Sequence, residues 1–252
     1  MKRMALLALL MLGFVAGLVA FAPLSAALKA SGAAQRGLSW TQAEGTVLSG
    51  RVLGLALRGV RYGEADVAFS PGGLLIGNLQ YTVDWTGPQG AGRAKVSAGG
   101  GGRVALRDFA VSLDLAQLEQ AALWIRQSGG RLDLSGPSLR FGPEGCMSAE
   151  GSARSDVLER NQDILGSGWT PMQGALRCEG GTLVIPMASE NQTGTRFEAT
   201  LRLAPQQPGQ FEARVSGLVP RDLAFALPIA GFTPQGQDFV YLFSTSDMSA
   251  PK

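Results

Sequence analysis

The sequence predicts a mainly β protein, in which one N-terminal transmembrane helix is followed by a curved antiparallel β-sheet that forms an open, taco-like groove with a few short helices. Three observations support this fold class. They are an uncharged run at the N-terminus, a period-2 alternation of apolar and polar residues, and the presence of 35 glycines among 252 residues. Glycine at this frequency without a collagen period indicates many tight turns between short strands.

The predicted membrane segment lies at the N-terminus. Lys2 and Arg3 precede an uncharged stretch whose apolar core runs from Met4 to Ala22. About 20 apolar residues suffice to cross a bilayer, whereas the apolar part of a signal peptide has about 7–15 residues. The two cations favour a cytoplasmic N-terminus. We therefore expect a single-pass protein of the cell inner membrane with the bulk of the chain in the periplasm. A cleaved signal peptide remains the alternative, because small residues occur at 20–27.

The chain is expected to have one domain after the anchor. Residues 1–29 form the cytoplasmic tip and the signal-anchor helix, residues 30–245 form a periplasmic β-rich domain, and residues 246–252 form a flexible tail. The glycine run at 97–102 is expected to be a turn rather than a linker, and no change of composition requires a second domain.

Alternation predicts strands in order along the chain. Apolar residues alternate with polar ones in most of these segments, which is typical of antiparallel sheets with one apolar and one wet face. The strands are predicted near 50–59, 81–86, 111–115, 131–141, 197–203 and 211–215. Short helices are predicted at 116–127, at 155–166 with Ser155 as the N-cap, and at 220–231 with Pro220 at the first helical position.

The composition argues against an enzyme. The chain has no histidine, which removes the usual general base near neutral pH, the commonest metal ligand and the usual partner of a serine or cysteine nucleophile. Ser49 is interpreted as a turn residue, and acidic residues such as Asp84, Asp133 and Asp222 as solvated side chains. We therefore expect no catalytic residues, no cofactor and no metal. With a formal net charge of +2 and no basic cluster, we also expect no nucleic-acid partner.

The two cysteines, Cys146 and Cys178, occur in similar glycine-bounded hairpin settings. In an oxidising compartment two such cysteines usually pair, so we expect a structural disulfide. Closing a loop of this length stabilises a fold by about 3–4 kcal/mol on the chain-entropy argument. Two free buried cysteines are the alternative, and a metal site is disfavoured because two thiolates cannot complete a tetrahedral shell.

Two short motifs carry a family resemblance. After the charged tip and the membrane segment, LSWTQAEGTVLSGRVLGLAL resembles the opening of the type II secretion system protein N family. The segment at 67–77 is similar to a second family motif, and GRLDLSGPSLRF at 130–141 resembles a strand pair in the middle of the family. The family-like residues are Gly45, Thr46, Val47, Ser49, Gly50, Pro71, Leu74, Leu75 and Gly77.

The resemblance implies a function. It implies a non-enzymatic accessory inner-membrane component of the type II secretion system, which acts through protein–protein binding in the periplasm. The implied partners are other type II secretion components, together with the lipid bilayer through the N-terminal helix. The family is also similar to AsmA-like proteins, whose sheets form a groove with a lipid-friendly interior. A periplasmic lipid-binding or lipid-transfer protein is therefore the alternative, with a bound lipid as a possible ligand.

Overall fold

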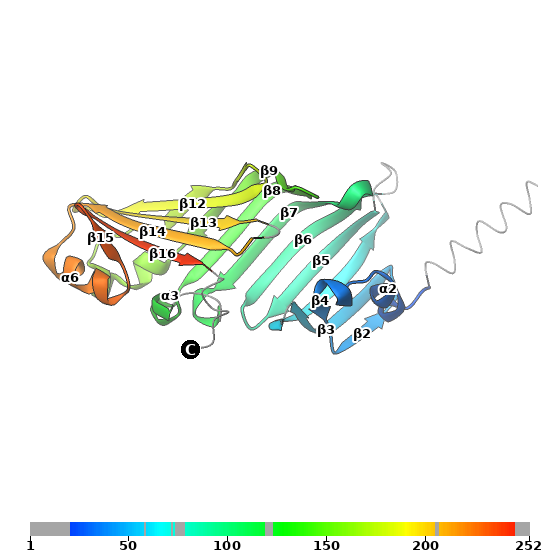
Figure 1. Cartoon of the computed structure of the whole chain (residues 1–252). Coiled ribbons are helices and arrows are strands. Elements are labelled where there is room, and N and C mark those ends of the chain that lie inside the picture. The colour runs from blue at the N-terminus through cyan, green and yellow to red at the C-terminus, as the bar shows by residue number, and fades with distance from the viewer. Residues whose placement is uncertain are drawn as a thin grey trace, which may run out of the picture. The chain divides into compact units, whose positions relative to one another are not determined.

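The computed structural model describes residues 21–57, 59–71, 73, 79–118, 123–204 and 207–244 (Figure 1). The chain folds into two compact units, and the boundary between them lies between Ser97 and Ala98. Most of the apolar run at 4–22 and the predicted tail at 246–252 lie outside the described residues. Within the described ranges, no helix has the length and apolar character needed to cross a membrane. The transmembrane helix therefore stays a prediction.

The first unit is an antiparallel sheet with one helix at its start. Strand β3 (Ser49–Leu57) pairs with β1 (Leu38–Ser39) at one end and with β2 (Gln42–Gly45) at the other, and β4, β5 and β6 follow in order. Helix α2 (Leu24–Ala30) contacts β2. The remaining elements are η1 (Ala34–Arg36), β4 (Val60–Ser70), β5 (Leu79–Gly87) and β6 (Gly90–Gly99), which ends just past the division.

Cross-strand pairs explain the two faces of this sheet. Residues directly opposite each other on antiparallel strands share a face, and Val67 lies opposite Val83 while Phe69 lies opposite Tyr81. The other face is charged, because Arg51, Asp66 and Asp84 occupy successive positions across β3, β4 and β5. Arg51 forms an ion pair with Asp66 at 2.6 Å, and Arg93 forms an ion pair with Asp84. The two adjacent carboxylates are thus each neutralised by an arginine.

The second unit is a longer antiparallel sheet. Its strands lie in the order β7-β8-β9-β10-β12-β13-β14-β16-β15, and β11 pairs with the other end of β12. The strands are β7 (Arg103–Asp114), β8 (Arg131–Gly142), β9 (Gly145–Ser155), β10 (Met172–Ala175), β11 (Arg177–Glu179), β12 (Thr182–Glu190), β13 (Thr195–Leu203), β14 (Gln210–Gly217), β15 (Thr233–Gln235) and β16 (Asp238–Ser244). The helices are η3 (Gly100–Gly102), η4 (Leu115–Gln117), α3 (Leu123–Ser128), α4 (Val157–Arg160), α5 (Gln162–Leu165) and α6 (Arg221–Ile229).

The mainly β, antiparallel fold with short helices is confirmed, and the helices differ from prediction in detail. The segment predicted at 116–127 contains η4 and α3, with 119–122 outside the described residues. The segment predicted at 155–166 is divided into α4 and α5 at Asn161, and Asp156 rather than Ser155 is the N-cap residue. Ser155 still accepts a hydrogen bond at Oγ from the N–H of Val157 at 3.4 Å. Helix α6 begins directly after Pro220, which is its N-cap rather than its first residue.

The core of the second unit is built around β12 and its neighbours. Ile185 and Val184 on β12 are fully buried, as are Met172 on β10 and Leu158 on α4. A polar network closes the turn between β12 and β13: Asn191 Oδ1 accepts hydrogen bonds from the N–H groups of Thr193 and Thr195 at 3.0 and 2.9 Å. Since Asn191 is buried, these bonds satisfy an oxygen that would otherwise lack water.

The predicted disulfide is confirmed. Cys146 and Cys178 are bonded, with their Cα atoms 5.5 Å apart. The N–H of Cys146 also donates a hydrogen bond to the carbonyl oxygen of Gly181 at 2.7 Å, which adds a β-bridge beside the disulfide. The loop that the disulfide closes contains most of β9, all of α4 and α5, and β10.

Candidate functional site: an apolar cavity in the second unit

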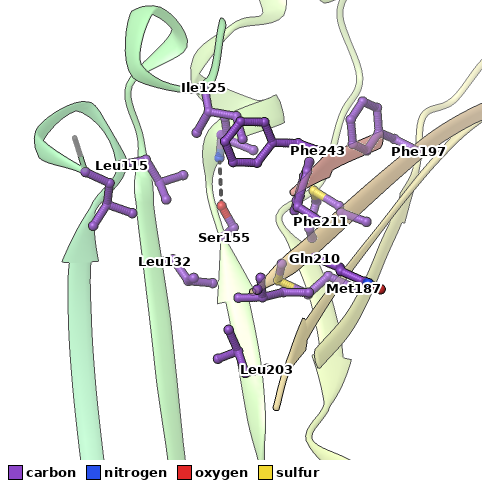
Figure 2. Close-up of a pocket in the computed structure, with 16 residues that line it drawn as sticks. Leu115, Ile125, Leu132, Ser155, Met187, Phe197, Leu203, Gln210, Phe211 and Phe243 are labelled. Atoms are coloured by element: carbon purple, nitrogen blue, oxygen red, sulfur yellow. Dashed lines mark hydrogen bonds between the residues drawn. The ribbon is translucent and has the colours of Figure 1, made fainter. Parts of the chain in front are cut away.

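An apolar cavity of about 260 Å³ lies within the second unit (Figure 2). Most of its lining comes from strands of the sheet, and the rest comes from η4, α3, α4 and the approach to β14. The lining residues are Leu115, Leu118, Ile125, Leu132, Ser155, Val157, Met172, Met187, Phe197, Ala199, Leu201, Leu203, Gly209, Gln210, Phe211 and Phe243.

Two walls of the cavity face each other. Leu115, Leu132 and Ser155 lie on one side in Figure 2, and Phe211 and Phe243 lie on the other. The second wall follows from strand register: Leu201 is opposite Phe211, and Phe211 is opposite Phe243, so the three side chains share one face of the sheet. Because β8 and β14 line the same space, the sheet of the second unit must curve.

The cavity has a closed end and an open end. The side chains that β13 directs into it become more exposed along the strand, from 4% at Phe197 and Ala199 to 42% at Leu203. Gln210, where β14 begins, is also exposed and lies at the same end as Leu203, because Gln210 is opposite Arg202. Solvent therefore reaches the cavity beside Leu203.

The chemistry of the lining is almost purely aliphatic and aromatic. Among the described residues that line the cavity, only Ser155 and Gln210 are polar and none is ionisable, and the register places the Gln210 side chain on the opposite face with Arg202. Ser155 is buried, and its Oγ already accepts a hydrogen bond from the Val157 N–H. The described lining residues can therefore surround an apolar group with aliphatic and aromatic contacts.

A hydrogen-bond cluster next to the cavity fixes α4. Asp156 Oδ1 accepts from the N–H of Arg131 at 2.6 Å, and Oδ2 accepts from Arg160 Nε at 2.7 Å. Partial burial raises the pKa of Asp156, but the hydrogen bonds from Arg160 and Arg131 outweigh it, so the pKa lies below its usual value. Asn161 Nδ2 donates to the carbonyl oxygens of Ser128 and Val157 at 2.9 and 2.6 Å. These bonds hold Val157 in the cavity lining.

The opposite face of the same strands is charged. Arg202, Glu212, Arg214 and Asp238 form a chain of ion pairs across β13, β14 and β16, with nitrogen–oxygen distances of 3.6, 3.7 and 3.3 Å. Leu242 is exposed on this face, opposite Glu212. The alternation predicted for 197–203 and 211–215 thus separates an apolar cavity face from a solvated charged face.

The described family-like residues belong to the first unit, and none of them is among the residues that line the cavity. Gly45 to Gly50 form the turn between β2 and β3, in which the Thr46 N–H donates to the Ser49 carbonyl at 2.8 Å. Gly45 has a φ of +82°, and a Cβ atom there would lie 2.5 Å from the Ser49 carbonyl oxygen, so the turn requires glycine. Val47 donates its N–H to the Ala22 carbonyl at 3.0 Å. This part of the motif shapes a hairpin.

The rest of the motif carries less structural information. Pro71 follows β4 directly. Leu74, Leu75 and Gly77 lie outside the described residues. The cavity residues were not singled out from the sequence as a site, although the alternation at 197–203 and 211–215 was the signal that marked their strands. Among the described residues, no group of three or more His, Cys, Asp or Glu side chains could hold a metal.

The fold and the cavity together define a mainly β protein with antiparallel sheets and an apolar binding cavity. The chain belongs to the type II secretion system protein N family, whose model matches residues 36–242. The matched range runs from η1 to β16 and so includes strands of both units. No curated protein and no solved structure matches the chain. Family membership confirms the resemblance seen in the sequence and involves the protein in type II secretion.

Proposed function

We propose that the protein is a non-enzymatic accessory component of the type II secretion system that is anchored in the inner membrane and binds other secretion components in the periplasm. The family match over residues 36–242 carries this proposal. The apolar run from Met4 to Ala22 supports the anchor. The Cys146–Cys178 disulfide supports an oxidising compartment such as the periplasm.

Two features support a binding role without a chemical step. The chain has no histidine, and the residues that line the cavity include no ionisable group. The exposed acidic side chains Asp66 and Asp84 are each paired with an arginine and so have a structural explanation. General acid–base catalysis needs a titratable group within reach of the reacting atoms, and the described residues that line this cavity include none.

The test combines secretion with co-purification. A deletion strain should lose export of a type II substrate, and the full-length chain should restore it. Purified in mild detergent, the full-length chain should bring down secretion-platform proteins that mass spectrometry identifies. Normal secretion in the deletion strain, together with no secretion protein in the eluate, would contradict the proposal.

One observation favours lipid binding as a second function, namely the apolar cavity of the second unit. An apolar cavity with a solvent-exposed mouth is the usual form of a site for a water-insoluble ligand.

A further inference from the structure

We propose that the cavity between β8–β9 and β13–β14 binds one unbranched alkyl chain of a lipid, which enters beside Leu203 and extends toward Phe197. This site rests on the second proposed function, lipid binding, and binding to secretion proteins does not require it. The cavity could hold a lipid chain whether or not those proteins bind.

The dimensions of the cavity fit a single chain. The lining follows β13 from Phe197 to Leu203, a distance of about 20 Å at about 3.3 Å per residue. A group the size of a water molecule takes about 30 Å³, so 260 Å³ holds about eight or nine methylene groups. A space of this volume admits part of one alkyl chain and is too small for two chains.

The chemistry of the cavity fits the apolar part of an amphiphile. A charged or polar headgroup inside would lose its water without gaining an ionic partner, because no lining residue is ionisable. Beside the mouth, by contrast, the exposed Gln210 lies with Arg202 and Glu212 on the opposite, charged face of the strand ends. The headgroup would therefore stay in solvent beyond Leu203, while the chain displaces water from the apolar walls.

At the closed end of the cavity, the side chains of Val157 and Phe197 form a partition. A second cavity of about 220 Å³ lies beyond it, and Val157 and Phe197 line both. Phe197 is held there by an edge-on contact with Phe232, with 6.3 Å between ring centroids. The far side of the second cavity includes Leu223 and Leu227 of α6. Phe197 therefore limits how deep a chain can reach, and so which chain lengths gain contacts.

The chain's own C-terminal residues are a poorer match for the cavity. Residues 245–252, which follow β16, read TSDMSAPK and contain an aspartate, a lysine and several hydroxyl side chains. These groups would be buried without partners against the aliphatic lining. A lipid chain carries no such cost.

Photo-crosslinking in a bilayer tests the site with the full-length chain. The protein is placed in vesicles of phosphatidylethanolamine and phosphatidylglycerol that contain a phosphatidylethanolamine with a diazirine either at mid-chain or at the chain end. A free fatty acid with the same labels forms a second arm, which distinguishes a phospholipid from a free acid as the source of the chain. Cross-linked residues are located by mass spectrometry.

The expected result depends on the depth of the label. In at least one arm, the mid-chain label should react near Leu201 and Phe211, and the terminal label should react near Val157 and Phe197. Labelling that is the same at both depths, or confined to the charged face around Leu242, would overturn the proposal. So would a cavity that yields only protein–protein contacts with residues 245–252.

Two variants sharpen the test. Leu201→Trp fills the cavity, and removing room for about two methylene groups at about 0.8 kcal/mol each should lower labelling about tenfold. Leu242→Trp is the matched control on the other face of the sheet and should leave labelling unchanged. Equal labelling of both variants would contradict the site. Co-purification of secretion proteins should be the same for both variants, which separates failure of this site from failure of the proposed function.

The partition is tested by Phe197→Leu, which keeps an apolar side chain and a smaller volume. In this variant the terminal label should also reach Leu223 and Leu227 of α6. A labelling pattern identical to that of the parent protein would show that Phe197 does not limit chain depth.

Discussion

The two units contain the same kind of strand but bury it to different extents. In the first unit, the cross-strand pairs Phe69–Tyr81 and Val67–Val83 form an apolar face whose side chains are only half-buried. In the second unit, Ile185 and Val215 are almost inaccessible to solvent. The alternation of apolar and polar residues therefore identifies which face of a strand is apolar, but it does not show whether that face is shielded from solvent.

The difference follows from what covers each sheet. In the second unit the sheet curves, and α4 and α6 direct Leu158, Leu223 and Leu227 into its interior. In the described part of the first unit, α2 covers the sheet only near its beginning, where Leu24 approaches Gly50. The second unit thus holds its own core, whereas the first depends more on contacts between neighbouring strands.

The largest expected effect comes from truncating the core of the second unit. Ile185→Ala should lower the free energy of unfolding of that unit by about 4 kcal/mol, because a fully buried side chain leaves a cavity. Val83→Ala in the first unit should cost only about 1 kcal/mol, since its side chain is half-buried. Urea denaturation with hydrogen exchange resolved by unit measures both. Equal losses would break the comparison between the units.

Removing the disulfide should have the next largest effect. The double variant Cys146→Ala/Cys178→Ala loses a cross-link between residues 32 apart, which should cost about 3–4 kcal/mol. Hydrogen exchange should become faster in β9, β10 and β11 and stay unchanged in β3 to β5. Reductant added to the parent protein should reproduce this pattern and should leave the double variant unaffected. A loss of protection in both units would contradict the local role of the disulfide.

The turn between β12 and β13 offers a smaller effect. Asn191→Ala leaves the N–H groups of Thr193 and Thr195 without their acceptor, which should cost about 2 kcal/mol. Gln192→Ala is the adjacent control, and because Gln192 is exposed its cost should stay within about 0.5 kcal/mol. Thermal unfolding of the two variants measures the difference. Equal midpoints for them would show that the Asn191 network does not stabilise the turn.

The smallest expected effect is the loss of folding stability at acidic pH. The pKa of Asp156 is lowered in the folded protein, so its contribution to stability is present above the pKa of an unfolded aspartate, about 3.9. This contribution is lost as the pH falls through the lower folded-state pKa. Asp156→Asn should remove about 0.5 kcal/mol at pH 7 and nothing at the acid end of the titration.

Asp66 is the counterpart of Asp156 in the first unit. Its hydrogen bond with Arg51 lowers its pKa as well, but the pair is exposed to solvent. Asp66→Asn should therefore have no measurable effect on stability at either pH. Urea denaturation at pH 7 and in acid checks both variants, and a larger loss for Asp66→Asn would reverse the comparison.

Much of the fold could be predicted from residues, but the cavity could not. The alternation at 197–203 and 211–215 correctly placed one apolar face on each strand, and the two cysteines correctly indicated a disulfide. Phe197 and Leu203 belong to the same apolar stripe, yet one is sealed and the other is open to solvent. The difference in solvent exposure between these two residues arises from the curvature of the sheet and from the contact of Phe197 with Phe232. Both depend on contacts between segments that are distant in the sequence.

The helices show the same limit at a smaller scale. The spacing of apolar residues predicted one helix at 155–166, but the helix is divided at Asn161. The side chain of Asn161 donates a hydrogen bond to the Ser128 carbonyl, which lies 33 residues earlier in the chain. A local pattern contains no information about such a partner.

The Cys146–Cys178 disulfide gives the cavity an order of assembly. The loop that it closes carries Ser155, Val157 and Met172 of the lining, whereas Phe197, Phe211 and Phe243 come later in the chain. Both cysteines precede the residues of the opposite wall in the chain. In the proposed periplasmic location, an oxidant that acts during export would fix the first wall covalently before the second, and β13, β14 and β16 would then close against a surface that is already in place.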